Sequence, residues 1–258
     1  MKIRKIYQPI MIFVLSMILT SCATAPVKSP PVPVREVYPE ITAPILRQDT
    51  YHVVAPGETL WRLSKMYDVS IEDMVRINNL RSRTELKIGQ RLLIPNAAPM
   101  RPIVPLYQSN KWKYIIIHHS ATDEGNAMYF NKIHHIRGFW KGLGYHFVID
   151  NGTKGKLDGQ IEVAPRWLKQ QDGSHCKAAG MNHKGIGICL VGNFSKENVT
   201  EEQMKSLVYL VNILRDYYNI PVENILGHGQ VSGARTECPG KGFPWKEFYK
   251  RIKIRTDV

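Results

Sequence analysis

The chain has 258 residues, 43% of them hydrophobic, and carries a formal net charge of +13 at neutral pH. This length fits one large or two modest domains, and the composition excludes a globally disordered chain. The excess of positive charge indicates a polyanionic partner or surface. Nucleic acid is the usual partner of so basic a chain, but the N-terminal segment argues against it.

The first residues of the chain have the pattern of an export signal. MKIRKIYQPIMIFVLSMILTSCATAP, residues 1–26, begins with basic residues and continues with a ten-residue apolar stretch, residues 10–19. Such a stretch is too short to span a bilayer as a stable helix and is typical of a secretory signal. It ends at Leu19-Thr20-Ser21-Cys22, which resembles the lipobox of bacterial lipoproteins, where the cysteine becomes the lipidated N-terminus. An ordinary signal peptide with a chance cysteine is the alternative.

This resemblance implies a location for the mature chain. We expect residues 1–21 to be removed as a signal peptide and Cys22 to carry the lipid. By resemblance to lipoprotein sorting rules, Ala23 and Thr24 contain no inner-membrane retention signal. We therefore expect the chain to be lipid-anchored to the bacterial outer membrane, facing the periplasm. The membrane is then a partner through the anchor, and nucleic acid is not a partner.

Export changes the interpretation of the four cysteines. Disulfides form in an oxidising compartment, but Cys22 is committed to lipid, which leaves Cys176, Cys189 and Cys238. Three is an odd number, so at least one of these thiols is free or binds a metal. A Cys176–Cys189 disulfide and a purely apolar role for Cys189 in a buried strand both remain open.

Two proline-rich segments divide the chain. Residues 22–48 begin with the lipidated cysteine, contain six prolines with almost no apolar periodicity, and are predicted to form an extended tether. The second segment, PNAAPMRPIVP (95–105), falls between two segments with regular apolar patterns. We therefore expect a small domain at 49–96, a linker at 97–110 and a larger domain at 111–258. Outside the export signal, no apolar run is long enough to span a membrane.

The small domain has the pattern strand, helix, helix, strand. A short strand at 51–54 precedes the turn signal Pro56-Gly57, and Thr59 lies where a helix N-cap belongs. Ser70 is the expected cap of a second helix, and the strand RLLIP closes the unit. The residues alone thus predict a small βααβ fold, with or without a ligand.

Specific residues of this domain resemble a known module from end to end. The pattern VxPGETLWxLSxxYxVSxxxxxxxNxL…LxxGQxLxIP is similar to the lysin motif, or LysM, family. LysM modules bind the N-acetylglucosamine-containing glycan of peptidoglycan or chitin. The resemblance implies a glycan-binding groove formed by two segments, with the residues Gly57, Glu58, Thr59, Leu60, Leu86 and Ile88.

The large domain combines predicted strands with a well-marked helix. Its apolar strand segments are KYIIIHHSAT (113–122), GYHFVIDNGTKG (144–155) and GIGICLVGNF (185–194). Thr200 and Gln203 form a capping box at the start of a helix that ends near Asn219. This order predicts an α/β fold with a mixed central sheet flanked by helices.

Three residues of the large domain have the chemistry of zinc ligands. His118 lies at the end of the first strand, and His228 and Cys238 lie at either end of the segment GHGQVSGARTECPG, residues 227–240. A hydrolytic zinc site keeps three protein ligands and one open position, whereas a structural site is closed by four. His119 follows a ligand, but successive strand residues point to opposite faces, so we do not expect it to bind the metal. From residue types alone, a cysteine nucleophile activated by His228 remains an alternative.

The large domain also resembles a known family. The segments IIIHHSAT, HxxxxxWKGLGYHFVIDNG, GSHCKAAGMNHKGIGICLVGNF and GHGQVSGARTECPG resemble, in order, the zinc N-acetylmuramoyl-L-alanine amidases. This family (amidase type 2) includes phage lysozyme-amidases and animal peptidoglycan recognition proteins, and the resemblance covers about residues 112–245. It implies Zn²⁺ held by His118, His228 and Cys238. Tyr145 matches the catalytic tyrosine, and Thr236 lies where many bacterial and phage members have lysine.

The resemblance also implies a reaction and a partner. The expected substrate is peptidoglycan or its muropeptides, cleaved at the amide bond between N-acetylmuramic acid and L-alanine. Tyr145 would orient the attacking water, and the Thr236 hydroxyl would help to stabilise the oxyanion. The residues that match cleft-lining positions, and are expected to contact substrate, are His135, His175 and Asn182. We expect a monomer.

Two other functional classes remain as alternatives. The first is a lipoprotein that recognises or tethers peptidoglycan without cleaving it. The second is the cysteine peptidase with Cys238 as nucleophile, which predicts loss of activity on alkylation and indifference to chelators. The zinc site predicts the reverse.

Overall fold

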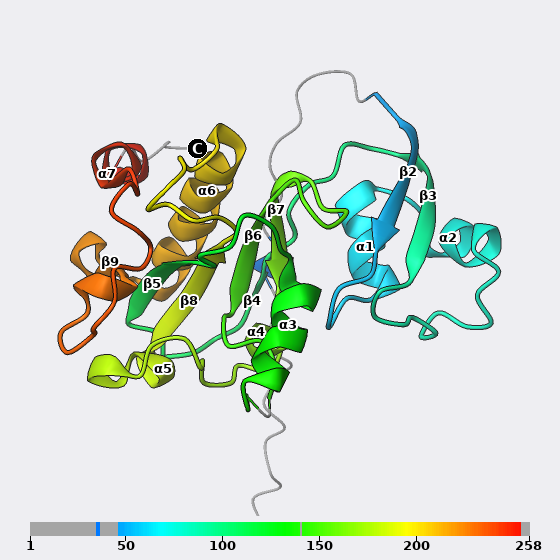
Figure 1. Cartoon of the computed structure of the whole chain (residues 1–258). Helices are drawn as coiled ribbons and strands as arrows, with labels where there is room; N and C mark the ends of the chain where they lie inside the picture. Colours follow the sequence, from blue (N-terminus) through cyan, green and yellow to red (C-terminus); the bar gives the residue numbers. More distant parts are fainter. Residues whose placement is uncertain (1–34, 37–45, 140, 254–258) are drawn as a thin grey trace, which may run out of the picture. The chain divides into compact units, whose positions relative to one another are not determined.

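The computed structural model describes residues 35–36, 46–139 and 141–253 (Figure 1). The predicted signal peptide, the lipidation site Cys22 and most of the predicted tether lie outside the described residues. Among the helices that are described, none combines the length and the apolar composition needed to cross a membrane.

The small domain contains two strands and two helices in the predicted order. Strand β2 (Gln48–Val53) pairs antiparallel with β3 (Arg91–Ala97), and helices α1 (Leu60–Tyr67) and α2 (Ile71–Ile77) lie between them in sequence. Thr59 caps α1 by accepting from the Arg62 amide, and Ser70 caps α2 by accepting from the Asp73 amide. The fully buried core side chains include Leu63, Met66, Met74, Leu92 and Ile94. The predicted βααβ arrangement is confirmed.

The large domain is built on a five-stranded mixed sheet. Its strands are β5 (Tyr114–His119), β6 (Phe147–Asn151), β7 (Asp158–Val163), β8 (Gly185–Leu190) and β9 (Ile225–Gly227). The order across the sheet is β7-β6-β8-β5-β9, with every neighbouring pair parallel except the hairpin β6–β7. Gly152, in the turn between β6 and β7, has a φ of +82°, which glycine adopts without strain. A separate two-stranded pair joins β1 (Arg35–Glu36) and β4 (Pro105–Leu106).

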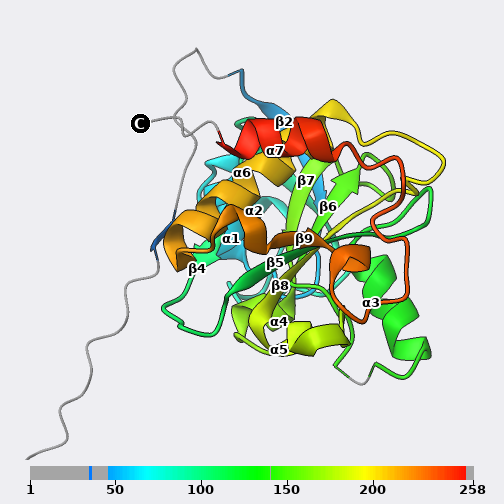
Figure 2. The ribbon, with the colours of Figure 1, turned by 90° about the vertical axis from the view of Figure 1, so that its left-hand side faces the viewer.

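Helices pack on both faces of this sheet (Figure 2). They are α3 (Ala127–Ile136), α4 (Pro165–Leu168), α5 (Met181–Lys184), α6 (Glu201–Tyr218) and α7 (Trp245–Lys253), with 3-10 turns η1 (Ala178–Gly180), η2 (Val222–Asn224) and η3 (His228–Gln230). Helix α6 begins at the predicted capping box, in which the Thr200 and Gln203 side chains each bond the other's backbone. The fold predicted for this domain is confirmed.

Successive side chains of each strand point to opposite faces of the sheet, so the two faces differ in the residues they carry. Ile115 and Ile117 of β5 pack with residues of α6 in the main hydrophobic core. Ile116 and His118 of the same strand point to the opposite face, because successive strand residues alternate. On that opposite face, Val148 of β6 packs with Phe130 of α3. One face thus carries the core, and the other carries His118.

A buried contact between a carboxylate and an imidazole lies inside the small domain. The Glu58 carboxylate accepts from the Ala55 amide at 2.7 Å and lies 2.7 Å from His52 Nε2. The other ring nitrogen of His52 lies 2.9 Å from the Tyr67 hydroxyl. Burial by itself raises the pKa of Glu58, but the bond and charge of His52 and the Ala55 amide outweigh it and lower the pKa to about 2.

We predict that Glu58 makes the stability of the small domain depend on pH. Its pKa is lower in the folded than in the unfolded state, so its contribution is complete above about pH 5 and is lost as the pH falls toward 2. The Glu58→Gln variant should therefore be less stable than wild type at pH 6. Below pH 5 the difference in unfolding free energy between wild type and Glu58→Gln should shrink by at most about 1.4 kcal/mol per pH unit.

Urea unfolding at several pH values measures this effect. Glu72→Gln is the matched control, because the Glu72 carboxylate is 64% exposed and pairs with the exposed Arg83. A wild-type–variant gap that stays constant from pH 6 to pH 3 would show that the buried Glu58 carboxylate is not the titrating group.

Candidate active site

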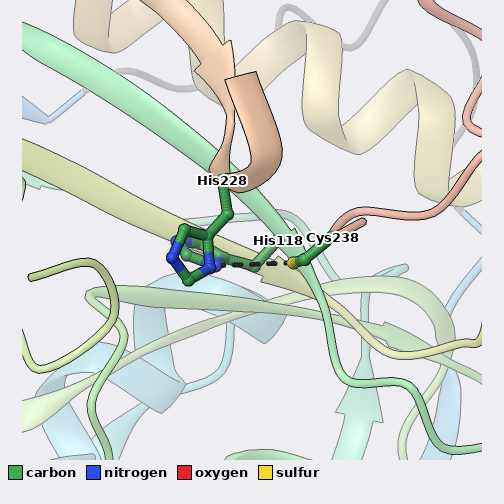
Figure 3. A group of neighbouring side chains, drawn as sticks. All are labelled: His118, His228 and Cys238. Atoms are coloured by element: carbon green, nitrogen blue, oxygen red, sulfur yellow. Dashed lines mark hydrogen bonds between the residues drawn. The ribbon is translucent and has the colours of Figure 1, made fainter. Parts of the chain in front are cut away.

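Three side chains of types that commonly bind metals meet at the carboxyl end of β5. His118 is the fifth residue of β5, His228 begins η3 directly after β9, and Cys238 lies in the loop that follows. One ligand atom from each lies within 4.8 Å of the others (Figure 3). Ile117 of β5 pairs with Gly227, the last residue of β9, so the residues that follow them, His118 and His228, lie side by side.

His119 lies outside this group, as strand alternation predicts. Its Nδ1 accepts from the Phe194 amide at 3.2 Å, and its ring packs against the Phe194 ring. Its backbone amide, however, donates to Cys238 Sγ at 3.4 Å. His119 therefore supports the site through its main chain.

Backbone contacts fix the loop that carries Cys238. The Gly229 amide donates to the Cys238 carbonyl at 2.7 Å, and the Cys238 amide donates to the Thr236 hydroxyl at 3.2 Å. A Cβ on Gly229 would lie 2.4 Å from the Thr236 carbonyl oxygen, so this close approach of two chain segments requires glycine. The segment between His228 and Cys238 is thus closed at its base by a short hydrogen bond.

The donor set and its spacing fit a zinc ion. Cys238 Sγ lies 3.6 Å from His118 Nδ1. Zinc–sulfur and zinc–nitrogen bonds of about 2.3 and 2.0–2.1 Å at a tetrahedral angle place those two atoms about 3.6 Å apart. Two imidazoles and one thiolate leave a fourth position open, as in hydrolytic zinc sites.

The electrostatics of the site also suit a bound cation. Burial lowers the pKa of His118 well below its usual value, with the neighbouring His175 and His228 adding to the effect. The imidazole is therefore neutral, which is the form that binds metals. Burial also raises the pKa of the Cys238 thiol to about 12. A thiolate at this position therefore needs a nearby positive charge, which a divalent cation would supply.

Tyr145 packs directly on His118. Its ring centroid lies 5.2 Å from that of His118 and 5.5 Å from that of His134. His134 Nδ1 accepts from the Gly144 amide at 3.0 Å, which fixes the backbone just before Tyr145. Burial, with Cys189 and Cys238 nearby, raises the pKa of Tyr145 well above 10. Its hydroxyl therefore keeps its proton at neutral pH and can donate a hydrogen bond.

Comparisons with known proteins agree with this geometry. Residues 108–241 match the sequence profile described as N-acetylmuramoyl-L-alanine amidase, and residues 52–95 match that of the LysM domain. The first match covers more than half of the chain. The chain belongs to the N-acetylmuramoyl-L-alanine amidase family. It is an enzyme of this amidase class, and in general terms it hydrolyses an amide bond in peptidoglycan.

Several relatives resemble the larger domain of this amidase. The endolysin of Enterobacteria phage T3 is 37% identical over 149 residues, which are 55% of this chain and 88% of the relative. The endolysin of Escherichia phage T7 is 32% identical over the same shares of both chains. Peptidoglycan-recognition protein SC2 of Drosophila melanogaster is 29% identical over 148 residues, 54% of this chain and 73% of the relative.

The residues expected to contact substrate differ in their surroundings. His135 is exposed on α3. His175 is only 8% exposed, and its Nδ1 lies 3.0 Å from His118 Nε2. The Asn182 side-chain oxygen accepts from the amides of His175 and Cys176, each at 2.8 Å. The structure thus brings His175 and Asn182 behind the metal-ligating group, a contact that sequence patterns did not predict.

The remaining predicted residues are placed as follows. Thr236 is exposed at the edge of the site. In the LysM domain, Gly57, Thr59 and Ile88 are exposed and Leu86 is half-buried, whereas the side chains of Glu58 and Leu60 are directed into the domain. Cys176, Cys189 and Cys238 are all free thiols, so in the described structure Cys176 and Cys189 are not joined.

Proposed function

We propose that this amidase is a zinc hydrolase that cleaves the bond between N-acetylmuramic acid and L-alanine in peptidoglycan. The observation that carries the proposal is the convergence of His118, His228 and Cys238 within 4.8 Å of one another. The ring of Tyr145 packs beside this group on His118. Membership of the amidase family supports the reaction class.

The side chains of the site have distinct tasks in this reaction. Zinc, when bound by His118, His228 and Cys238, supplies Lewis acidity to the scissile carbonyl and to water. The protonated Tyr145 hydroxyl donates a hydrogen bond and so orients the reacting groups. Thr236 accepts from the Cys238 amide, which leaves its hydroxyl hydrogen available for the developing oxyanion. Loss of such a donor typically costs about 10²–10³ in rate.

Two observations weigh against the alternative classes. The pKa of Cys238, raised to about 12 by burial, disfavours a free thiolate nucleophile at neutral pH. A recognition protein that does not cleave has no need for a complete three-ligand group with a protonated tyrosine beside it. Both alternatives remain distinct outcomes of the experiment below.

We further propose that the other parts of the chain bring the enzyme to its substrate. The LysM domain would bind peptidoglycan glycan through the groove that includes the exposed Gly57, Thr59 and Ile88. Residues 1–21 would be a signal peptide and Cys22 a lipid anchor in the bacterial outer membrane, facing the periplasm. The formal charge of +13 suits an anionic wall or lipid surface. We propose a monomer with no nucleic-acid partner.

The proposed reaction predicts a zinc-dependent product. The chain from Thr24 onward, incubated with muropeptides, should release stem peptides that begin with L-alanine, identified by mass spectrometry. Activity should vanish after chelation and return when zinc is restored. His228→Ala should abolish it, and Tyr145→Phe should lower the rate by about 10²–10³. His183→Ala is the matched control, because the His183 side chain is 73% exposed and pairs with Asp172.

Each alternative would give a different pattern. Binding to peptidoglycan without any free stem peptide would identify a recognition protein. Activity that survives chelation but is lost on alkylation of Cys238 would identify a cysteine peptidase.

The proposed glycan groove predicts that Ile88 contributes to wall binding. Ile88 is 59% exposed, and burying an isoleucine side chain against a ligand contributes about 1.5–3 kcal/mol. In an inactive His228→Ala background, Ile88→Ser should weaken co-sedimentation with purified sacculi by about tenfold or more. Ile77→Ser is the control, because Ile77 is 46% exposed on α2, outside the proposed groove. Equal binding by both variants would argue against this groove.

A further inference from the structure

His175 has an environment that its expected role as a substrate contact does not explain. Its residue is 8% exposed, and both ring nitrogens have protein partners. Nδ1 lies 3.0 Å from His118 Nε2, and Nε2 lies 3.2 Å from the Gly185 carbonyl oxygen. A substrate could engage the His175 nitrogens only by breaking one of these contacts.

The hydrogen positions along this chain of contacts follow from chemistry. His118 Nδ1 is the nitrogen that faces Cys238 Sγ, so it must present a lone pair to a metal. The hydrogen of neutral His118 is then on Nε2 and is donated to His175 Nδ1. The hydrogen of neutral His175 is in turn on Nε2, where the Gly185 carbonyl accepts it. A single tautomer of each ring satisfies every contact.

The space around the His175 ring is shaped to hold it in one orientation. A Cβ on Gly173 would lie 2.2 Å from the His175 Cδ2 atom, and a Cβ on Gly187 would lie 2.5 Å from the same atom. The ring therefore fills a slot that two glycines open. It packs edge-on against the His118 ring, with centroids 5.0 Å apart and an interplanar angle of 82°.

Asn182 holds the backbone of this slot. Its side-chain oxygen accepts from both the His175 and the Cys176 amides, and its carbonyl accepts from the Gly173 amide at 2.8 Å. One residue thus fixes the loop on both sides of His175. The Asn182 side-chain oxygen therefore closes the loop through contacts within the protein.

We propose that His175 is a positioning residue for the metal ligand His118, and that Asn182 positions His175 in turn. The inference rests on the proposed zinc site, because it assigns the partner of one zinc ligand. A metal-bound histidine commonly donates its second N–H to a group that fixes its tautomer and orientation, and loss of that group typically costs about 10–100-fold in metal affinity or activity. Here a second imidazole, backed by a backbone carbonyl, takes that place.

Zinc affinity tests this role without relying on catalysis. The full chain, purified in detergent and stripped of metal, would be titrated with zinc in competition with a chromophoric chelator. His175→Ala should weaken zinc binding by about 10–100-fold. His175→Asn should bind within about threefold of wild type, because the asparagine oxygen lies near the position of Nδ1 and still accepts from His118. When cobalt replaces zinc, the cysteine-to-metal absorption band should rank wild type and the two His175 variants in the same order.

Variants of neighbouring residues sharpen the test. Asn182→Ala should weaken zinc binding several-fold, and Asn182→Asp should restore it, because an aspartate oxygen can accept the same two amides. His183→Ala, an exposed histidine in the same segment, should leave zinc affinity unchanged. If His175→Ala does not fold, the zinc affinities of His175→Asn, Asn182→Ala and Asn182→Asp still test whether His175 positions His118.

The outcomes separate this inference from the proposed function. If His175→Ala binds zinc like wild type but raises KM, His175 contacts substrate and the positioning role is overturned. If His175→Asn binds zinc as weakly as His175→Ala in a folded protein, the hydrogen bond from His118 is not what matters, and the role is again overturned. A wild-type chain that binds no zinc would instead overturn the proposed zinc site.

Discussion

The parallel pairing of β5 with both β8 and β9 is the constraint on which the site depends. Because β5 is flanked by parallel neighbours, its carboxyl end opens at the same edge as theirs. The hydrogen-bond register then sets His118 against His228 with ring centroids 4.8 Å apart. The sheet register therefore brings together the two histidines of the candidate metal site, and Cys238 is brought to them by the loop that follows η3.

Because successive side chains point to opposite faces of the sheet, one face is apolar and packs on α6, and the other face carries the site. The side chains of β5 and β8 that pack against α6 leave the intervening positions to His118, Gly187 and Cys189. On the site face, Gly187 provides the space that the His175 ring fills. Carboxylates are absent from the described metal-ligating group, so a divalent cation with one thiolate would leave net positive charge facing the carbonyl of a substrate.

The sequence predicted the regular parts of this protein because their signals are local. The apolar runs of β5 and β8, the capping box at Thr200 and the βααβ order of the LysM domain each follow from patterns within a few residues. Helix α3 and strand β7 were not predicted; in β7, DGQIEV, Ile161 and Val163 are the apolar residues, and Glu162 separates them. The meeting of His118, His228 and Cys238 was expected from residue types and family resemblance. The contact of His175 with His118 was not, because it joins residues 57 positions apart through a loop closed by Asn182.

The shortness of β9 has a consequence for self-association. This edge strand has three residues, and the chain leaves the extended conformation at His228 to enter a 3-10 turn. An edge with so few free amides and carbonyls is a poor template for a strand from a second molecule. The backbone break that turns His228 toward His118 and Cys238 therefore also limits edge-to-edge pairing with a second molecule.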